Sequence, residues 1–274
     1  MANKVRLDTL LVERGLIETR EKAKRTIMAG LVFSDGNRLD KPGVKVNADL
    51  PIQVKGKAIP YVGRGGLKLE KAIHDFQINL QDRTMVDIGS STGGFTDCAL
   101  QNGAGKCYAV DVGYNQLDWK LRNDPRVIVM ERTNFRYATI DLFENGLPDF
   151  ASIDVSFISL RLILPVLKTI LAPESDIVAL IKPQFEAGRE QVGKKGIVRD
   201  KKIHKQVVSD LLTFANDLDF NIENITYSPI TGGDGNIEFL VHLTWNKNEQ
   251  TNIDDQQLDN MVEQVIDEAH HVHE

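Results

Sequence analysis

The feature that most constrains the fold is a short apolar run followed by a cluster of small residues, at positions 85–96. The run Met-Val-Asp-Ile is followed by Gly-Ser-Ser-Thr-Gly-Gly-Phe-Thr. Such a run predicts a buried parallel strand, and the small residues predict a tight turn into a helix. Glycines let a backbone approach a ligand closely, and open α/β sheets bind ligands beyond the carboxyl ends of their strands. The motif therefore predicts a ligand cradle.

The order of residues in this motif narrows the choice of ligand. A dinucleotide-binding motif reads Gly-x-Gly-x-x-Gly, with its acid at the end of the next strand. Here Asp87 also precedes the first glycine, and Ser91 stands where a middle glycine is usual. This order resembles the first motif of S-adenosylmethionine (SAM) methyltransferases. The resemblance implies that Gly89, Ser91, Gly93 and Gly94 meet the methionine part of SAM and that Asp87 faces its amino group. A purely structural strand-to-helix turn is the alternative.

From position 84 onward the chain alternates between strand and helix patterns. Strands are expected near residues 84–89, 106–112, 126–130, 150–155, 176–181, 220–226 and 237–245, with crossover helices such as 95–102 and 204–218. This alternation predicts a doubly wound α/β domain. The last strand follows the sixth after a short link with Pro229 and no helix, so we expect it to pair antiparallel. An antiparallel last strand is a mark of the Rossmann-like SAM methyltransferase fold.

The first 60 residues have a different pattern and charge. They contain 12 Lys+Arg against 7 Asp+Glu, whereas the other 214 residues contain 21 against 32. The pattern predicts helices over residues 6–14 and 20–29, the second capped by Thr19, and a hairpin at Asp35-Gly36. The phrases at residues 6–8, 19–23 and 27–32 resemble the S4 RNA-binding module, a small α+β domain. A solvated basic face on an interaction domain is the alternative. The resemblance and the charge favour RNA binding through Arg6, Arg20, Lys22, Lys24 and Arg25.

These patterns divide the chain into an S4-like domain (1–60), a linker (61–66), a methyltransferase domain (67–247) and an acidic C-terminal tail (248–274). The tail has eight acidic residues and no Lys or Arg, and its apolar residues could form one face of a helix. No apolar run approaches the roughly 18 residues of a membrane span, and the N-terminus lacks a signal-peptide pattern. We therefore expect a cytoplasmic protein. Cys98 and Cys107 lack metal-ligand spacing, so we interpret both as packing residues.

Ionisable residues gather at the predicted strand ends. Asp154 ends the fourth strand and Lys182 ends the fifth, while Glu238 begins the antiparallel seventh, so all three are expected at one edge. Lys68, in a helix expected over residues 67–76, can fold over this edge too. Two lysines and two carboxylates at one edge are hard to explain as solvated surface, although a pair of salt bridges is the structural alternative. Asp111 ends the second strand, where an acid commonly holds ribose hydroxyls.

Further contacts are expected near this edge. Asn134 follows the third strand, where an adenine ring is often contacted, or it is an ordinary hydrogen-bonding loop residue. The basic loop 188–199 beside Lys182 could close over an RNA backbone, or be a solvated linker. The RNA-binding candidates in this loop and in the linker are Lys194, Lys195 and Arg64.

Four of these residues resemble a known catalytic set. The order Lys68, Asp154, Lys182, Glu238 is similar to the Lys-Asp-Lys-Glu tetrad of FtsJ-type RNA 2′-O-methyltransferases. With the S4-like domain and the phrases at residues 63–69, 87–96, 153–160 and 182–186, the chain resembles the TlyA (haemolysin A) family over about residues 4–245. The resemblance implies methylation of cytidine ribose 2′-hydroxyls in ribosomal RNA of the small and, in some members, the large subunit. It implies SAM as cofactor, ribosomal RNA or ribosomal subunits as partner, and no metal ion.

In this hypothesis Lys182 activates or steers the hydroxyl, Asp154 and Glu238 position it, and Lys68 helps to hold the ribose and phosphate. The alternatives are a non-catalytic RNA-binding or ribosome-assembly factor, an NAD-dependent oxidoreductase and a haemolysin-like membrane-active protein. The chain departs from the dinucleotide motif, and it has no strongly amphipathic basic helix to support membrane lysis. Only the first hypothesis predicts methyl transfer. The pattern does not indicate the oligomeric state or the ribosomal subunit.

Overall fold

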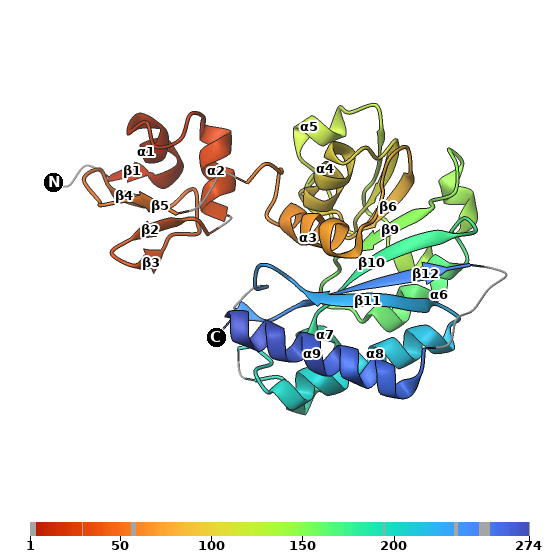
Figure 1. Ribbon diagram of the computed structural model, residues 1–274. Helices are drawn as coiled ribbons and strands as arrows, with labels where there is room; N and C mark the ends of the chain where they lie inside the picture. Colours follow the sequence, from red (N-terminus) through yellow and green to blue (C-terminus); the bar gives the residue numbers. More distant parts are fainter. Residues whose placement is uncertain are drawn as a thin grey trace. The chain divides into compact units, whose positions relative to one another are not determined.

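The chain folds into two compact units, Met1–Gly66 and Leu67–Glu274. The computed structural model describes residues 4–28, 30–55, 59–193, 195–232, 235–246 and 253–273. Figure 1 shows the helices and strands of both units. The boundary between them falls at the end of the glycine-rich stretch, where glycine leaves the backbone the greatest conformational freedom.

The first unit contains two helices and two small sheets. Its helices are α1 (Leu7–Glu13) and α2 (Arg20–Met28), and its strands are β1 (Lys4–Arg6), β2 (Val32–Ser34), β3 (Asn37–Arg38), β4 (Lys45–Asn47) and β5 (Gln53–Val54). The strand β2 pairs antiparallel with β3 and β5, and β1 pairs antiparallel with β4. The β1–β4 ladder was not predicted, because three residues per strand are too few to show a period of two.

Local interactions explain why this part of the chain adopts these elements. The Thr19 hydroxyl accepts a hydrogen bond from the Lys22 amide at 3.2 Å, which caps α2 as predicted. Asp35 and Gly36 have φ values of 47° and 79°, the conformation that a two-residue turn between β2 and β3 requires. The apolar faces of the two helices meet the sheet in one core, formed by Leu7, Leu11, Ala23, Ile27 and Val32.

The second unit is built on a seven-stranded sheet. Its strands are β6 (Thr84–Ile88), β7 (Lys106–Val110), β8 (Val127–Met130), β9 (Phe150–Ile153), β10 (Ser175–Ile181), β11 (Asn221–Tyr227) and β12 (Phe239–Trp245), in the order β11-β12-β10-β9-β6-β7-β8. The five strands β6 to β10 pair parallel with one another, whereas β12 is antiparallel to both β10 and β11. The predicted doubly wound sheet with an antiparallel last strand is confirmed.

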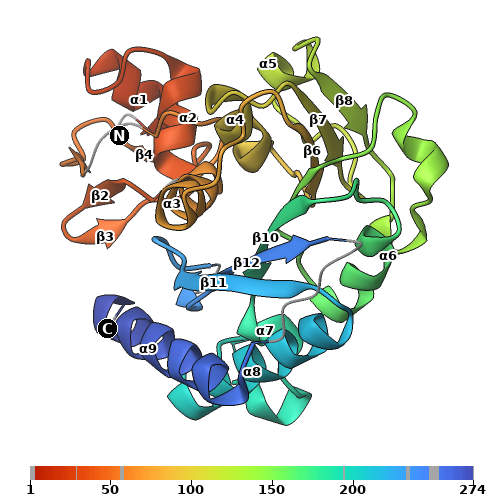
Figure 2. The ribbon, with the colours of Figure 1, turned by 45° about the vertical axis from the view of Figure 1, so that its right-hand side comes forward.

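Helices cover both faces of this sheet. Figures 1 and 2 show α3 (Gly66–Phe76), α4 (Gly94–Gln101) and α5 (Trp119–Arg122) on one face, and α6 (Leu164–Lys168), α8 (Lys201–Asp217) and α9 (Asp255–His273) on the other. The short helix α7 (Pro183–Glu186) directly follows β10, and 3-10 turns cover 135–137, 140–143, 160–162 and 189–191. Because both faces are covered, the central strands are buried throughout, and this explains their continuous apolar sequences.

The segment expected as an acidic tail is part of the second unit. Its helix α9 buries Val262, Val265 and Ile266 in the same core as α8 and the sheet. Its acidic side chains face outward, and Glu263 pairs with Lys205 of α8 at 3.3 Å. The apolar stripe of α9 therefore packs against the domain, and this explains why the segment is not separate from it.

Candidate active site

The glycine-rich motif forms the turn between β6 and α4, and the backbone geometry explains three of its positions. Gly89 has a φ of 86°, and a Cβ there would lie 2.5 Å from the backbone oxygen of Asp154. Gly93 has a φ of 93°, and a Cβ there would collide with Leu121 of α5. Ser91 has a φ of 49°, a left-handed conformation that favours glycine and explains the usual residue at this position.

The Asp87 side chain is buried behind the turn, and its expected contact with the amino group of SAM stays a prediction. Its carboxylate accepts hydrogen bonds from the Thr96 amide (3.1 Å), the Thr96 hydroxyl (2.7 Å) and the Ser152 hydroxyl (2.8 Å). The residue is 1% exposed, and burial raises its pKa to about 6 even though these hydrogen bonds act in the opposite direction. Asp87 therefore connects β6 to α4 and β9 by buried hydrogen bonds, and these bonds stabilise the turn.

A cavity of about 740 Å³ opens at the carboxyl ends of β6, β7 and β9. This volume lies in the range of pockets that hold nucleoside-sized ligands. Four of the seven residues expected to bind the cofactor line it: Gly89, Ser91, Asp111 and Asn134. The other three are not among the lining residues: Asp87 lies in β6, Gly93 caps α4 and Gly94 is the first residue of α4.

Polar groups in the cavity wall are held by backbone hydrogen bonds. The Asp111 carboxylate accepts from the Ser91 amide (2.8 Å) and the Gly113 amide (2.7 Å), which joins the first two strand ends. The Asn134 side-chain oxygen accepts from the Arg136 amide at 3.2 Å. Each carboxylate oxygen of Asp111 keeps a lone pair, so the group can also accept hydrogen bonds from ribose hydroxyls.

The four predicted catalytic residues converge in the second unit. Lys68 Nζ donates to Glu238 Oε2 at 2.7 Å and to Asp154 Oδ2 at 3.3 Å. Lys182 Nζ lies 2.5 Å from Asp154 Oδ1. Asp154 therefore bridges two ammonium groups, one on each carboxylate oxygen. We call these four residues the tetrad.

The fold explains why the tetrad meets at one place. Asp154 and Lys182 directly follow the parallel strands β9 and β10, whose carboxyl ends share an edge. Glu238 immediately precedes β12, which runs antiparallel, so its start lies at that same edge. Lys68 reaches the edge from the first turn of α3. The expected convergence of the four side chains is present in the structure.

Burial and opposite charge together set the protonation of the tetrad. Burial disfavours the charged form of Lys68, but Asp154 and Glu238 outweigh it and hold the pKa of Lys68 above its ordinary value. Burial likewise disfavours the Asp154 carboxylate, yet the charges of Lys68 and Lys182 hold its pKa below the ordinary value. Asp154 is therefore a carboxylate and Lys68 an ammonium at neutral pH.

The members of the tetrad differ in their access to the cavity. Asp154 lines the cavity wall, whereas Lys68 is 5% exposed and Glu238 is 2% exposed. Lys68 contacts the buried carboxylates Asp154 and Glu238, and its expected role in holding ribose and phosphate stays a prediction. Lys182 also donates to the Ser156 hydroxyl at 3.1 Å, and Ser156 lines the cavity.

The structure adds residues that the sequence reading did not select. The segment after β9 contributes Ser156 and Phe157 to the cavity wall, and α7 contributes Phe185. The Phe157 and Phe185 rings lie 5.0 Å apart, and Phe157 is 90% exposed with a φ of 62°. Ser156 and Phe157 could have been predicted from the sequence, because they continue a polar and aromatic run past Asp154 at the carboxyl end of a strand.

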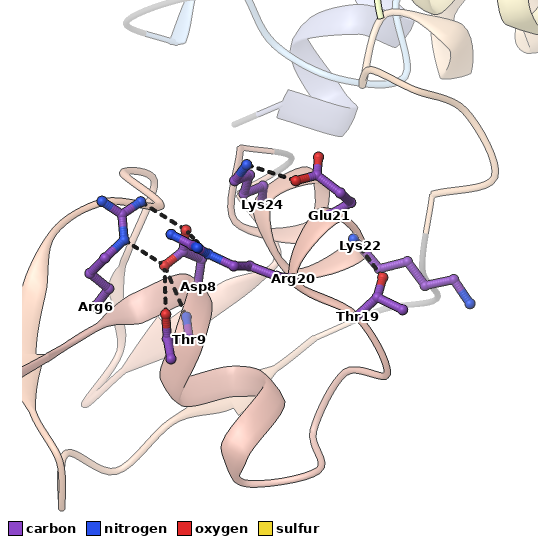
Figure 3. Close-up of polar contacts among 8 residues, drawn as sticks. All are labelled: Arg6, Asp8, Thr9, Thr19, Arg20, Glu21, Lys22 and Lys24. Carbon is purple, nitrogen blue, oxygen red and sulfur yellow. Dashed lines mark hydrogen bonds and ion pairs between the residues drawn. The ribbon is translucent and has the colours of Figure 1, made fainter. Parts of the chain in front are cut away.

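The RNA-binding candidates occupy several surroundings. In the first unit Lys22 pairs with Glu18. Arg6 and Arg20 both contact Asp8, and Lys24 pairs with Glu21 (Figure 3). Arg25 is half-buried in α2, and Arg64 is half-buried just before α3. Lys195 is exposed between β10 and α8, and Lys194 lies outside the described residues. Within the described residues, no helix is long and apolar enough to cross a lipid bilayer.

Comparison with known proteins places both units in families. The FtsJ-like methyltransferase family matches residues 61–245, and the S4 domain family matches residues 5–52. "Putative rRNA methyltransferase YqxC" of Bacillus subtilis (strain 168) is 63% identical over 98% of this chain and 95% of its own length. "16S/23S rRNA (cytidine-2′-O)-methyltransferase TlyA" of Mycobacterium tuberculosis (strain H37Rv) is 41% identical over 89% of this chain and 91% of its own length.

A solved structure agrees with these sequence relatives. "Putative hemolysin from Streptococcus thermophilus" superposes with a TM-score of 0.78 at 52% identity, covering 99% of this chain and 98% of its own. Both matched families, in the same order along the chain, correspond to the two units described above. The chain therefore belongs to the TlyA (haemolysin A) family, in which an S4 domain precedes an FtsJ-like methyltransferase domain.

Proposed function

We propose that this protein transfers a methyl group from SAM to the ribose 2′-hydroxyl of a cytidine in ribosomal RNA. The observation that carries the proposal is the tetrad, in which Asp154 joins Lys68 and Lys182 beside a nucleoside-sized cavity. The names of the relatives supply the substrate class, because the Bacillus subtilis relative is named an rRNA methyltransferase and the Mycobacterium tuberculosis relative an rRNA (cytidine-2′-O)-methyltransferase. Such a substrate implies that the enzyme acts in the cytoplasm.

The cavity wall fits SAM. The absence of a side chain at Gly89 leaves the backbone of the turn open to the ligand, since a Cβ there would press on Asp154. Asp111 offers carboxylate lone pairs for ribose hydroxyls, and Asn134 lies where an adenine would be held. When bound, SAM supplies an electrophilic methyl group on a sulfonium. Gly89, Ser91, Asp111 and Asn134 are the residues that would hold it.

The tetrad orients and activates the attacking hydroxyl. Lys182 Nζ is fixed by the Asp154 carboxylate and the Ser156 hydroxyl, so the third N–H of this ammonium has a defined direction. That N–H would donate to the 2′-oxygen and hold it in line with the methyl group, and the hydroxyl proton would leave to solvent water as the new O–C bond forms and the C–S bond breaks. Lys68 and Glu238 keep Asp154 in place from behind. Alignment of the reacting atoms supplies much of the rate, as in other reactions between two bound groups.

The test is transfer of tritium from labelled SAM to ribosomal RNA. We expect transfer by the wild-type protein and its loss in Lys182→Ala, with SAM affinity retained, because Lys182 does not line the cavity. Lys168→Ala is the matched control, since Lys168 lies on α6 of the same unit and pairs with Asp219 at 2.6 Å on the surface. Full transfer by Lys182→Ala would contradict the assigned role.

The substrate subunit is decided by the same assay with separate substrates. Small and large ribosomal subunits, and their naked RNAs, are offered in parallel, and ribose methylation is then mapped on the labelled RNA. Tight RNA binding without any transfer to either subunit would favour a non-catalytic assembly factor over the proposed enzyme.

A further inference from the structure

One side of the active-site cavity is formed by a segment without regular secondary structure. This segment, residues 154–159, connects β9 to the 3-10 turn at 160–162, and all of its residues line the cavity. We call it the cavity loop. The Asp154 amide donates to the Ile88 carbonyl at 3.0 Å, but the amides of the rest of the cavity loop donate to no backbone group among the described residues. Side chains must therefore hold the cavity loop in place.

The cavity loop contains a strained residue, Phe157. Its φ of 62° lies in the left-handed region that bulky side chains avoid, and the residue is 90% exposed. Packing in a core therefore does not compensate for the strain. A strained residue keeps its conformation only where its surroundings determine it. The contacts before and after Phe157 consequently decide the shape of this part of the cavity wall.

The half of the cavity loop before Phe157 is held by Lys182. The ammonium group of Lys182 lies 2.5 Å from Asp154 Oδ1 and donates to the Ser156 hydroxyl at 3.1 Å. Both of these partners precede the strained residue in the chain. The half that follows Phe157 needs an anchor of its own, because the strained backbone lies between the two halves.

Glu186, the last residue of α7, supplies the second anchor. Its Oε2 accepts a hydrogen bond from the Ser159 hydroxyl at 2.6 Å, and its Oε1 accepts from the Leu160 amide at 2.7 Å. The Ser159 oxygen in turn accepts from the Arg161 amide at 3.1 Å. Because a carboxylate can only accept, the Ser159 hydroxyl proton points to Glu186 and a lone pair points to the Arg161 amide. Each Glu186 oxygen is therefore used where the cavity loop ends.

A carboxylate is a costly choice for this place. Glu186 is half-buried, and the cavity is lined by Ser159 but not by Glu186. Burial raises the pKa of Glu186, while the hydrogen bonds from Ser159 and Leu160 and the charge of Arg161 act in the opposite direction. Hydrogen bonds to an ionised acceptor are shorter and stronger than those between neutral groups. Such bonds suit an anchor that has to hold a strained segment.

We propose that Glu186 is a positioning residue for methyl transfer, and that it acts on the cavity wall through Ser159 and Leu160. The inference rests on the proposed function, because it concerns how the cavity aligns the target ribose. The residues that would hold SAM follow β6, β7 and β8, whereas the cavity loop follows β9. Loss of the Glu186 anchor therefore lowers the rate of transfer more than the affinity for SAM.

The experiment measures kcat for methyl transfer to 16S and 23S rRNA, and Kd for SAM, in full-length proteins. Glu186→Gln keeps the size of the side chain but has one acceptor oxygen where the carboxylate has two. We expect kcat to fall at least about tenfold, as for misaligned reacting groups, with the SAM Kd within about twofold of the wild type. Glu223→Gln is the matched control and should keep the wild-type kcat. Glu223 is exposed on β11 of the same unit and also accepts from a hydroxyl, that of Thr244 at 2.7 Å.

Two further measurements separate positioning from folding. Ser159→Ala breaks one of the two Glu186 bonds, so it should have an intermediate kcat, and it stays testable if Glu186→Gln does not fold. Adding Ser159→Ala to Glu186→Gln should lower kcat by less than Ser159→Ala does alone, because both changes break the same contact. Hydrogen exchange of the amides of residues 155–160 needs no RNA, and we expect faster exchange in Glu186→Gln but not in Glu223→Gln.

Two results would overturn the inference: a wild-type kcat in Glu186→Gln, or unchanged hydrogen exchange of the cavity loop in that variant. A decrease in kcat that is matched by an equal loss of SAM affinity would also overturn it, because a general disturbance of the fold produces that pattern. If the wild-type protein transfers no methyl group to rRNA, the proposed function fails instead. The exchange measurement then decides by itself whether Glu186 holds the cavity loop.

Discussion

Replacing Asp154 by asparagine tests the arrangement of the tetrad most directly. The change keeps the size of the side chain and removes the charge that two buried ammonium groups share. Lys68 retains Glu238 at 2.7 Å, but among the residues that the structure describes Lys182 retains only the Ser156 hydroxyl, at 3.1 Å, as a hydrogen-bond partner. An asparagine side chain has one acceptor oxygen and one NH2 donor group, so it can accept from one of the two lysines while its NH2 group faces the other.

The size of the effect follows from this loss. Removing one partner of a buried ion pair costs about 3 kcal/mol or more, because the remaining charge is left unpaired. In a unit of this size, each kcal/mol lowers the melting temperature by roughly 2–4 °C, so we expect a decrease of about 6–12 °C. Methyl transfer should fall at least about 100-fold, because Lys182 loses its orientation, as expected when positioning of reacting groups is lost.

Calorimetry and tritium transfer measure the two effects, and two further variants make them specific. Asp219→Asn removes a surface partner of Lys168 and should change stability by less than about 1 kcal/mol. Asp154→Asn/Lys182→Met removes both opposite charges and should recover part of the lost stability, because no unpaired ammonium remains. A melting temperature of Asp154→Asn within 2 °C of the wild type, roughly the effect of 1 kcal/mol, would refute the reasoning.

The pH dependence of this difference has a defined sign. The pKa of Asp154 is lower in the folded protein than its ordinary value, so its stabilising contribution is present above the unfolded carboxyl pKa of about 3.9. It is lost as the pH falls through the folded pKa. The stability difference between the wild type and Asp154→Asn should therefore be constant from pH 6 to 8 and should shrink below about pH 4.

Two further substitutions test the turn behind the cavity. Gly89→Ala places a Cβ 2.5 Å from the Asp154 backbone oxygen, so we expect it to abolish SAM binding in calorimetry. Gly146 also has a positive φ but has open space around it, so Gly146→Ala should bind SAM normally. Equal SAM affinities of the two variants would contradict the steric argument. Asp87 has a folded pKa of about 6, above its unfolded value, so its favourable contribution is present at low pH and is lost as the pH rises from about 4 to 6. Between pH 4 and pH 7, the free energy of unfolding of the wild type should therefore fall by about 2–3 kcal/mol relative to that of Asp87→Asn, as measured by denaturant titration. A pH-independent difference between the two proteins would show that Asp87 is not buried as described.

Much of the architecture could be predicted because it depends on short-range pattern. The seven strands of the second unit, the helices between them and the antiparallel last strand follow from apolar runs, turn residues and the absence of a crossover helix before β12. The convergence of Asp154, Lys182 and Glu238 could also be predicted, because the direction of a strand decides at which edge its flanking residue lies.

Other features depend on contacts between segments far apart in the sequence. Asp87 is expected from the motif to face a ligand, and only the structure shows that Thr96 and Ser152, which lies 65 residues away, donate to its carboxylate. The acidic end of the chain looks like a tail, but its apolar stripe finds a partner surface on α8 and the sheet. In both cases the local pattern was correct, and the partner was not visible in it.

The amino-acid sequence alone determined the two-domain order, the sheet with its strand directions and the edge at which ionisable residues gather. Only the tertiary structure decided that Asp154 is shared between two lysines, that Lys68 is closed off from the cavity and that Asp8 holds Arg6 and Arg20. The physical reason is that periodicity determines which face or edge a side chain occupies, whereas its charge partners depend on distances of a few ångströms between segments that only the packed fold brings together.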